Sequence, residues 1–323
     1  MESTKTIHFK LFHTSNFMPV PSISAVICTY NRADRLALAL DGLEAQTLSA
    51  EHFEIVVVDN ASTDNTKAVC AAYQAKLPNL NYHYEPVQGL SRARNTGLQV
   101  AIGDYVAYLD DDAIPCADWL AEVAAAFKTI TPQPAAIGGP IYPIWEASPP
   151  AWMHHYVQGY YTVLDHGSES RWFPEGEYPY GANMIYRRDV LIENGGFSEA
   201  LGRDGKSLLS DEERLLNLTI ATQEGRFYYL ATASVQHWIP QERISQEWLL
   251  KRCYWQGRSG SVVDTTLGVP IVNQRIRGLQ GVCNVKRWIS QLLPDARRRI
   301  RARAWLMWSW GYLYQSLRPP TSV

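Results

Sequence analysis

Three consecutive carboxylates, Asp110, Asp111 and Asp112, follow the apolar segment "YVAYL" of this 323-residue chain. Adjacent carboxylates repel one another, so a positive partner is expected beside them. Oxygen ligands in a D-x-D spacing suit Mg²⁺ or Mn²⁺, which usually take further ligands from water or substrate phosphates. The alternative is a solvated turn that caps a helix. Because the triplet follows a buried strand, we favour a divalent-cation site that also handles a phosphorylated ligand.

Other polar clusters follow β-rich segments in the same way. Asp59 follows "FEIVVV" and could accept a ring N–H from a nucleobase, cap the next helix, or do both. Arg92 and Arg94 stand at an expected helix start, where arginines meet phosphate or lie on a solvated surface. The cluster after "ISAVIC" could present backbone and side-chain polar groups to a nucleotide, and it consists of Thr29, Tyr30, Asn31 and Arg32.

The elements that must position these clusters alternate between strand and helix. Residues 23–29, 53–59, 81–85 and 105–110 are short runs of apolar, β-branched or aromatic residues, and each is followed by a segment with helical spacing. This pattern predicts an α/β fold with a mostly parallel sheet covered by helices on both faces. Ligands bind beyond the carboxyl ends of such strands, where all the polar clusters fall.

The pattern loosens after about residue 140. The aromatic-rich stretch 142–180 could stack sugar rings, form a lid or pack as core. Residues 181–197 then predict a strand, a helix and a glycine stop, and residues 210–225 predict a capped helix followed by a strand over 226–230. We expect an irregular leader over 1–20, one catalytic domain over 21–240 and a helical extension over 241–323.

Composition narrows the partners and the location. The net charge of −2 gives no global field for nucleic acid, and five scattered cysteines with no C-x-x-C pair indicate a reducing cytosol. Residues 286–303 carry seven basic residues against one acidic residue, and "AWLMWSWGYLY" follows. This segment either contacts an anionic membrane at its cytoplasmic face through Trp305, Trp308 and Trp310, or packs on the catalytic domain.

Several motifs resemble those of the family 2 glycosyltransferases with the GT-A fold, over roughly residues 22–260. They are "AVICTYNR", "IVVVDNASTDNT", "GLSRARNTG", "YVAYLDDDAIP", "PYGANMIYRRDVLIENGGFSEALG", "LLSDEERLL" and "HWIPQERIS…YWQGRS". The ordered series is similar to the bacterial branch that builds polysaccharides or glycolipids. The resemblance implies an inverting transfer from a nucleoside-diphosphate sugar, with UDP favoured, to a saccharide or lipid-linked acceptor.

The resemblance also implies roles for individual residues. Asp59 would take the base and Asp110 the ribose side, and Asp112 would hold Mg²⁺ or Mn²⁺ on the diphosphate. His237 would touch the diphosphate or the metal, although a lone histidine is more often structural. The glycine-alanine-asparagine stretch that would line the acceptor pocket consists of Gly181, Ala182 and Asn183.

The resemblance also implies a position for the general base. The family usually places it at the second residue of a Glu-Asp pair that opens a helix, and here the pair is Asp211 followed by Glu212. The match puts Glu212 at the base position and leaves Asp211 as the second choice. Acidic residues also favour the first turn of any helix.

Two other functions remain open at this point. A sugar-nucleotide pyrophosphorylase would have a glycine-rich basic loop after the first strand, which "CTYNRADR" does not provide. A non-catalytic sugar-nucleotide-binding protein would have no use for both metal carboxylates and a candidate base. Dinucleotide-binding and P-loop functions are disfavoured, since neither G-x-G-x-x-G nor G-x-x-x-x-G-K-[ST] occurs.

Overall fold

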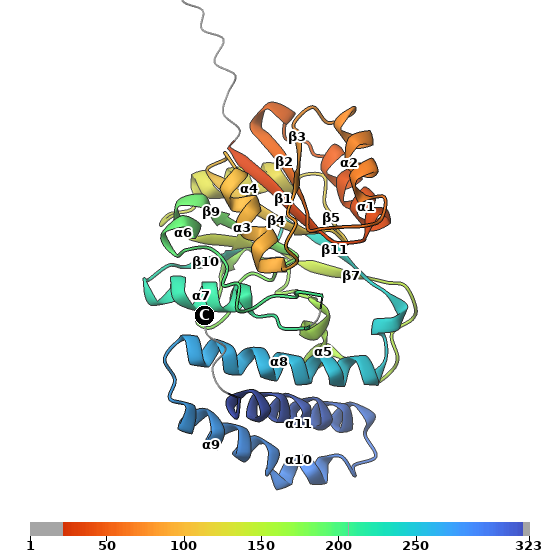
Figure 1. Cartoon of the computed structure of the whole chain (residues 1–323), viewed down its shortest axis with the longest axis vertical. Helices are drawn as coiled ribbons and strands as arrows, with labels where there is room; N and C mark the ends of the chain where they lie inside the picture. Colours follow the sequence, from red (N-terminus) through yellow and green to blue (C-terminus); the bar gives the residue numbers. More distant parts are fainter. Residues whose placement is uncertain (1–21, 206, 319–323) are drawn as a thin grey trace, which may run out of the picture.

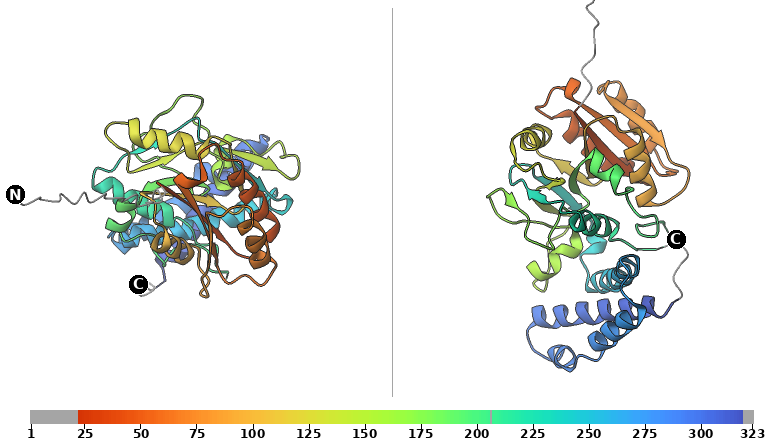
Figure 2. Two further views of the ribbon diagram at one scale, coloured as in Figure 1. Left: turned by 90° about the horizontal axis from the view of Figure 1, so that it is seen from above. Right: turned by 90° about the vertical axis from the view of Figure 1, so that its left-hand side faces the viewer.

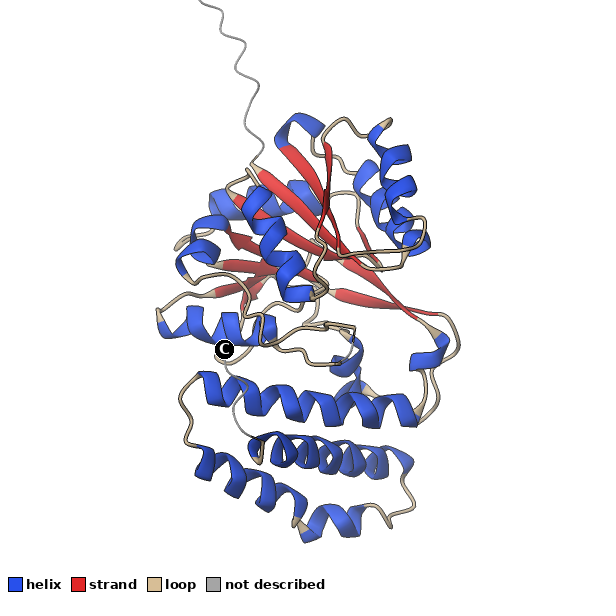
Figure 3. Cartoon of the chain, in the orientation of Figure 1, coloured by secondary structure: helices blue, strands red, loops and turns tan. Residues whose placement is uncertain are grey.

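The computed structural model describes residues 22–205 and 207–318, so the leader expected over 1–20 lies outside the described residues. A large sheet flanked by helices forms one end of the molecule, and a layer of helices forms the other (Figure 1). Figure 3 shows that nearly all strand residues lie in the first part and that the second part is helical.

The parallel half of the large sheet is built from the first four strands. These are β1 (Ile23–Thr29), β2 (Phe53–Asp59), β3 (Leu80–Tyr84) and β4 (Tyr105–Asp110). β1 pairs in parallel with both β2 and β4, so Cys28 lies opposite both Val58 and Asp110. All four strands were predicted within one residue, because β-branched and aromatic runs fit a sheet that is covered on both faces.

The remaining strands extend the sheet past β4 in the order β3-β2-β1-β4-β9-β6-β10-β8. β9 (Asn183–Arg187) runs antiparallel to β4 and to β6 (Ala136–Gly138), whereas β6 pairs in parallel with β10 (Phe227–Tyr229). β8 (Arg171–Trp172) is antiparallel to β10. The sheet is therefore mixed, with four parallel and three antiparallel pairs, so parallel pairing predominates as predicted.

A small second sheet brings a distant segment beside the aspartate triplet. β11 (Val235–Ile239) pairs with β5 (Ala113–Pro115) on one side and β7 (Ile141–Trp145) on the other. The register places His237 opposite Ala113, directly after the triplet. This pairing of strands more than a hundred residues apart positions the histidine.

Helices cover both faces of the large sheet. On one face, Ile23, Ala25 and Ile27 of β1 share a core with α1 (Ala33–Glu44), α2 (Thr66–Gln74) and α4 (Trp119–Thr129). On the other, Val26 shares a core with α3 (Leu90–Val100), α6 (Arg188–Glu193) and α7 (Glu212–Thr222). The predicted two-sided α/β architecture is thus confirmed.

The helical layer follows β11. α8 (Gln246–Thr266) and α11 (Ala296–Ser316) pack along one another, and α9 (Ile271–Val282) and α10 (Val285–Ser290) close the layer on its outer side (Figure 2). The two helices approach closely at Gly257 of α8 and Gly311 of α11 because glycine has no Cβ. A Cβ at either position would overlap the backbone of the other helix. The predicted helical C-terminal segment is confirmed, whereas the domain boundaries stay a prediction.

The aromatic-rich stretch 142–180 supplies core. Trp145 and Trp152 join Tyr161 in a cluster that packs against Leu249 of α8 and Ile300 of α11. Tyr161 stacks within 4.9 Å of Trp248 between ring centroids. Of the interpretations left open for this stretch, the structure favours core packing, and α5 (His155–Gln158) is its only α-helix among the described residues.

Candidate active site

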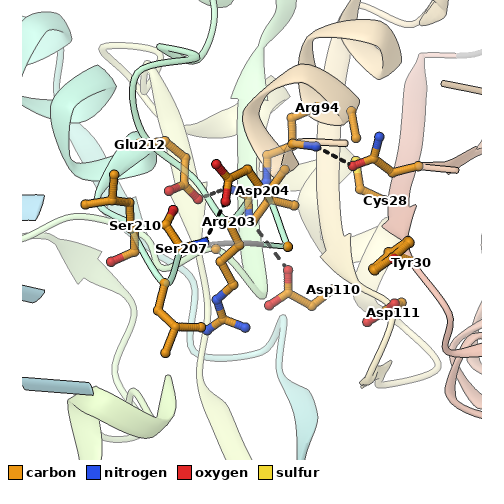
Figure 4. Close-up of a pocket in the computed structure, with 18 of the residues that line it drawn as sticks. Cys28, Tyr30, Arg94, Asp110, Asp111, Arg203, Asp204, Ser207, Ser210 and Glu212 are labelled. Carbon is orange, nitrogen blue, oxygen red and sulfur yellow. Dashed lines mark hydrogen bonds and ion pairs between the residues drawn. The ribbon is translucent and has the colours of Figure 1, made fainter. Parts of the chain in front are cut away.

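A cavity of about 520 Å³ lies between the carboxyl ends of β1 and β4 and the helix α8. It is within the size range of sites that enclose a small-molecule ligand. The start of α3, residues 203–205 and 207–210, and the start of α7 also line it. Figure 4 shows Asp110, Arg94, Arg203 and Glu212 gathered around this space from separate elements.

Asp110, Asp112 and His237 form one cluster beside the cavity. Each offers one ligand atom, and these atoms all lie within 4.8 Å of one another. His237 Nε2 is 3.2 Å from Asp112 Oδ1, and both side chains are almost wholly buried. Burial opposes charge on both groups, but each partner stabilises the other's charge: the pKa of Asp112 is lowered and that of His237 is raised.

The cluster fits a divalent cation. Ligand atoms bound to one ion at about 2.0–2.6 Å lie no more than about 5 Å apart, as they do here. Two carboxylates and an imidazole suit Mn²⁺, and the carboxylates also suit Mg²⁺. The buried Nδ1 of His237 has no hydrogen-bond partner among the described residues, whereas Nε2 faces the Asp112 carboxylate, which favours a proton on Nε2.

Asp111 has a different role from its two neighbours. Its Oδ2 accepts a hydrogen bond from Thr29 Oγ1 at 2.8 Å, and its Oδ1 lies 2.9 Å from Arg32 Nη1. The same guanidinium nitrogen lies 2.8 Å from Asp112 Oδ2. Burial raises the pKa of Asp111 to about 6 despite the opposing effect of Arg32. Arg32 is thus the positive partner that holds two of the three repelling carboxylates together.

Arg94 connects the aspartate triplet to the start of α7. It is 3% exposed, pairs through Nη1 with Glu212 Oε1, and lies with Nη2 3.6 Å from Asp110 Oδ1. Glu212 Oε2 is buried and has no hydrogen-bond partner among the described residues. One oxygen of Glu212 is therefore fixed by an arginine, the other has no partner, and the residue itself lines the cavity.

The two acids on either side of Glu212, Asp211 and Glu213, have side chains that point in different directions. Asp211 has a left-handed φ of 71°, and its side chain accepts from Gln256 of α8, so it does not line the cavity. Burial raises the pKa of Asp211 to about 6. Glu213 does line the cavity, and burial followed by the charge of Glu212 raises its pKa to about 8. Of the two candidate bases, Glu212 is the one that faces the cavity.

A second set of cations lines the cavity with no ion pair to a carboxylate among the described residues. Burial and neighbouring arginines lower the pKa of Arg203 to about 10, and burial also lowers the pKa of Arg243. Such an array is costly unless an anion binds it. The set consists of Arg203, Arg243, Lys251 and Arg252. We did not predict these residues from the sequence, because nothing in it distinguishes them from cations on the surface.

Three predicted donor residues lie outside the cavity wall. Asp59 is buried, and its carboxylate accepts from Tyr82 Oη at 2.7 Å and from the Ser62 backbone at 2.9 Å. Asn31 accepts from the backbone of Thr63, and Arg92 pairs with Glu199 on the surface. Thr29, Tyr30 and Arg32 do line the cavity. Of the two arginines expected at the start of α3, Arg94 lines the cavity and Arg92 does not, so a donor contact by Arg92 stays a prediction.

Of the stretch expected to line an acceptor pocket, residues 181–183, only the first residue lies at the cavity. Gly181 lines the cavity, and a Cβ there would crowd Arg94 Nη2 at 2.9 Å. Ala182 and Asn183 are fully buried instead. The amide of Asn183 donates to the backbone of Ala233 at 2.8 Å and accepts from the indole of Trp119 at 3.0 Å. Both faces of the large sheet are covered, so both side chains are buried and neither lines the cavity, and their acceptor contact stays a prediction.

This arrangement has clear relatives. The sequence matches the model of glycosyl transferase family 2 over residues 24–195, more than half of the chain, and the protein belongs to that family. It is 29% identical over 250 residues to the glucosyl-dolichyl phosphate glucuronosyltransferase of Haloferax volcanii, which covers 75% of this chain and 77% of that one. It is 28% identical over 236 residues to the succinoglycan biosynthesis protein ExoM of Rhizobium meliloti, covering 72% of each.

Solved structures agree on the fold. The mannosyltransferase PcManGT of Pyrobaculum calidifontis, in complex with GDP-Man and Mn²⁺, superposes with a TM-score of 0.57 at 19% identity, over 90% of this chain and 86% of that chain. S. aureus TarS 1-349 gives 0.54 at 20% identity, over 90% and 89%. The protein is a glycosyltransferase with the GT-A fold, and both the suspected family and the enzyme class are confirmed.

Proposed function

We propose that the protein is an inverting, metal-dependent glycosyltransferase that moves a sugar from a nucleoside-diphosphate sugar to a hydroxyl of a saccharide or lipid-linked acceptor. One observation carries this proposal. The candidate cation ligands Asp110, Asp112 and His237 line the same cavity as the acid Glu212. Family membership favours this transfer over the pyrophosphorylase and the non-catalytic binding protein.

The donor end of the reaction needs stabilisation of a leaving diphosphate. A divalent cation held by Asp110, Asp112 and His237 would supply Lewis-acid neutralisation of that charge. Arg203 and Arg243 line the same cavity and would add fixed positive charge to the diphosphate. Thr29 and Tyr30 lie at the β1 end of the cavity, where we place the nucleoside. A base contact by Asp59 stays a prediction.

The acceptor end needs a base on the attacking hydroxyl. The Glu212 carboxylate, which lines the cavity, would take that proton, while Arg94 holds Oε1 and fixes the direction of the carboxylate. Displacement from the face opposite the leaving diphosphate inverts the anomeric centre. Asp211 would orient the start of α7 through Gln256 and take no part in proton transfer.

The donor nucleotide and the acceptor are inferred from similar proteins and from the family resemblance. Neighbouring folds include TarS 1-349 in complex with UDP and in complex with UDP-GlcNAc, and PcManGT in complex with GDP-Man, and we favour UDP on the family resemblance. The names of the two relatives support a lipid-linked or polysaccharide acceptor. The cytoplasmic location expected from the sequence stays a prediction.

A donor screen followed by a transfer assay tests the proposal. The cognate sugar nucleotide, offered among UDP-, GDP- and dTDP-sugars, should raise the melting temperature only with Mn²⁺ or Mg²⁺ present. Transfer to a panel of saccharide and lipid-phosphate-linked acceptors should then give a product of inverted anomeric configuration. Donor binding unaffected by excess chelator, or a product of retained configuration, would contradict the proposal.

A further inference from the structure

The helices α9 and α10, with the turn after α10, carry a set of exposed apolar side chains. They recur at helical spacing, so each helix presents one stripe. Leu292 is 84% exposed, Val285 67% and Val272 59%, values that a packed helix face does not have. We call this surface the α9–α10 face, and it consists of Val272, Ile276, Leu279, Val285, Trp288, Ile289 and Leu292.

The opposite side of α9 explains why this stripe is left over. Gln274, Gly278 and Val282 are buried there, and a Cβ at Gly278 would crowd Leu313 of α11. α9 thus already has a packed side, and nothing in the described part of the chain covers its apolar outer side. Both Figure 1 and Figure 2 place α9 and α10 at the end of the molecule farthest from the large sheet.

The segment that carries this face is rich in basic residues. Residues 271–303 contain nine basic residues and one acidic residue, Asp295, whereas the whole chain has a net charge of −2. Arg298 has a side chain that is 73% exposed, although it also lies 3.6 Å from Asp295, and Arg287 stacks on exposed Trp305 at 3.5 Å from the ring centroid. Exposed tryptophan and aliphatic side chains beside basic residues suit the headgroup region of an anionic bilayer.

We propose that the α9–α10 face docks onto an anionic lipid bilayer. The apolar stripe would enter the boundary between headgroups and acyl chains, and the basic residues would contact lipid phosphates. A second copy of this chain is a poor occupant, because two such faces would bring two sets of nine cations together. No helix among the described residues is long and apolar enough to cross a membrane.

The structure moves the contact away from the tryptophans first expected to make it. Trp308 is half-buried and stacks on Tyr312 at 5.0 Å, and α11 buries Leu306 and Leu313 between α8 and α9. The packed-helix alternative thus holds for most of α11, and its exposed Trp305 lies beside α10 through Arg287. The docking surface is independent of the transfer chemistry proposed for the cavity.

Vesicle binding by the full chain tests the docking surface. Phosphatidylcholine vesicles are compared with vesicles that also contain phosphatidylglycerol, at low and high salt. We expect binding only with phosphatidylglycerol, and weaker binding at high salt. Ile289→Gln with Leu292→Gln, and separately Lys286→Gln with Arg298→Gln, should each weaken binding roughly tenfold or more.

A matched control replaces exposed aliphatic residues at the other end of the molecule, Ile102→Gln with Ile192→Gln, which are 57% and 53% exposed. This variant should bind vesicles as the wild type does. Equal binding by all variants would overturn the proposal. So would a fall in melting temperature of the Ile289/Leu292 variant without lipid, since it would mean that the chain itself covers the face. Concentration-dependent dimers lost in that variant would assign the face to a second copy instead.

Discussion

His237 Nε2 lies 3.2 Å from Asp112 Oδ1, although 125 positions of the sequence separate the two residues. The pairing of β11 with β5 produces this contact, because it sets His237 opposite Ala113. The contact completes a set of ligand atoms that Asp110 and Asp112 alone would not provide. It also leaves the second oxygen of Asp112 to Arg32.

His237→Ala should weaken metal-dependent donor binding. Removing one of three ligands lowers cation affinity, and we expect a loss of roughly tenfold or more in donor affinity at limiting Mn²⁺. Titration of the donor at several Mn²⁺ concentrations measures it. Excess Mn²⁺ should recover part of the affinity in this variant and none in Asp112→Asn with Asp110→Asn. An unchanged Mn²⁺ dependence in His237→Ala would remove the histidine from the cation site.

Glu212→Gln should retain donor binding and lose transfer. Gln keeps the shape but cannot accept the acceptor proton, so we expect a fall of roughly a hundredfold or more in single-turnover rate at saturating donor. Asp211→Asn is the matched control, because its side chain faces Gln256 and not the cavity. It should cost much less. The reverse order of the two variants would make Asp211 the base.

Glu213 should make stability depend on pH. Burial and Glu212 raise the pKa of Glu213 to about 8, so the folded protein binds a proton that the unfolded chain releases near its ordinary value. Stability from this group is full below the unfolded pKa and is lost as pH rises toward 8. Glu213→Gln should therefore gain stability relative to wild type as pH rises, by on the order of 1 kcal/mol or more.

Melting temperatures of both proteins between pH 5 and about 8.5 provide the measurement. Glu193→Gln, an exposed acid of α6, is the control and should follow wild type across the range. A constant difference between Glu213→Gln and wild type would show that Glu213 titrates alike in the folded and unfolded states.

Gly311→Ala should destabilise the helical layer. A methyl group there would overlap the backbone carbonyl of Tyr254 in α8, which cannot move without separating the two helices. We expect a loss of roughly 1–3 kcal/mol in the free energy of unfolding, the range for overpacking a close contact. Denaturant unfolding measures it. Gln280→Ala, on the exposed side of α9, should change stability little, and an equal effect of both would contradict the close contact.

The first four strands could be predicted from the sequence because each carries its own apolar run and ends at a polar cluster. The aspartate triplet and the helix opened by Glu212 were likewise visible as local patterns, and their order along the chain was enough to suggest the family. Such features depend on near neighbours in sequence, which set backbone preference and the side that a residue faces.

Contacts between distant segments were decided by tertiary structure alone. Nothing local indicates that Arg94 would bridge Glu212 and Asp110. The hydrogen bonds of the Asn183 amide to Trp119 and Ala233 are equally invisible in the sequence. The same holds for the burial of Leu306 and Leu313 in α11 and the exposure of Ile276 and Leu279 in α9. The sequence alone does not show whether an arginine or lysine lies on the surface or in a cavity. Its role depends on which elements pack around it, because burial and the charges of its neighbours fix its electrostatics.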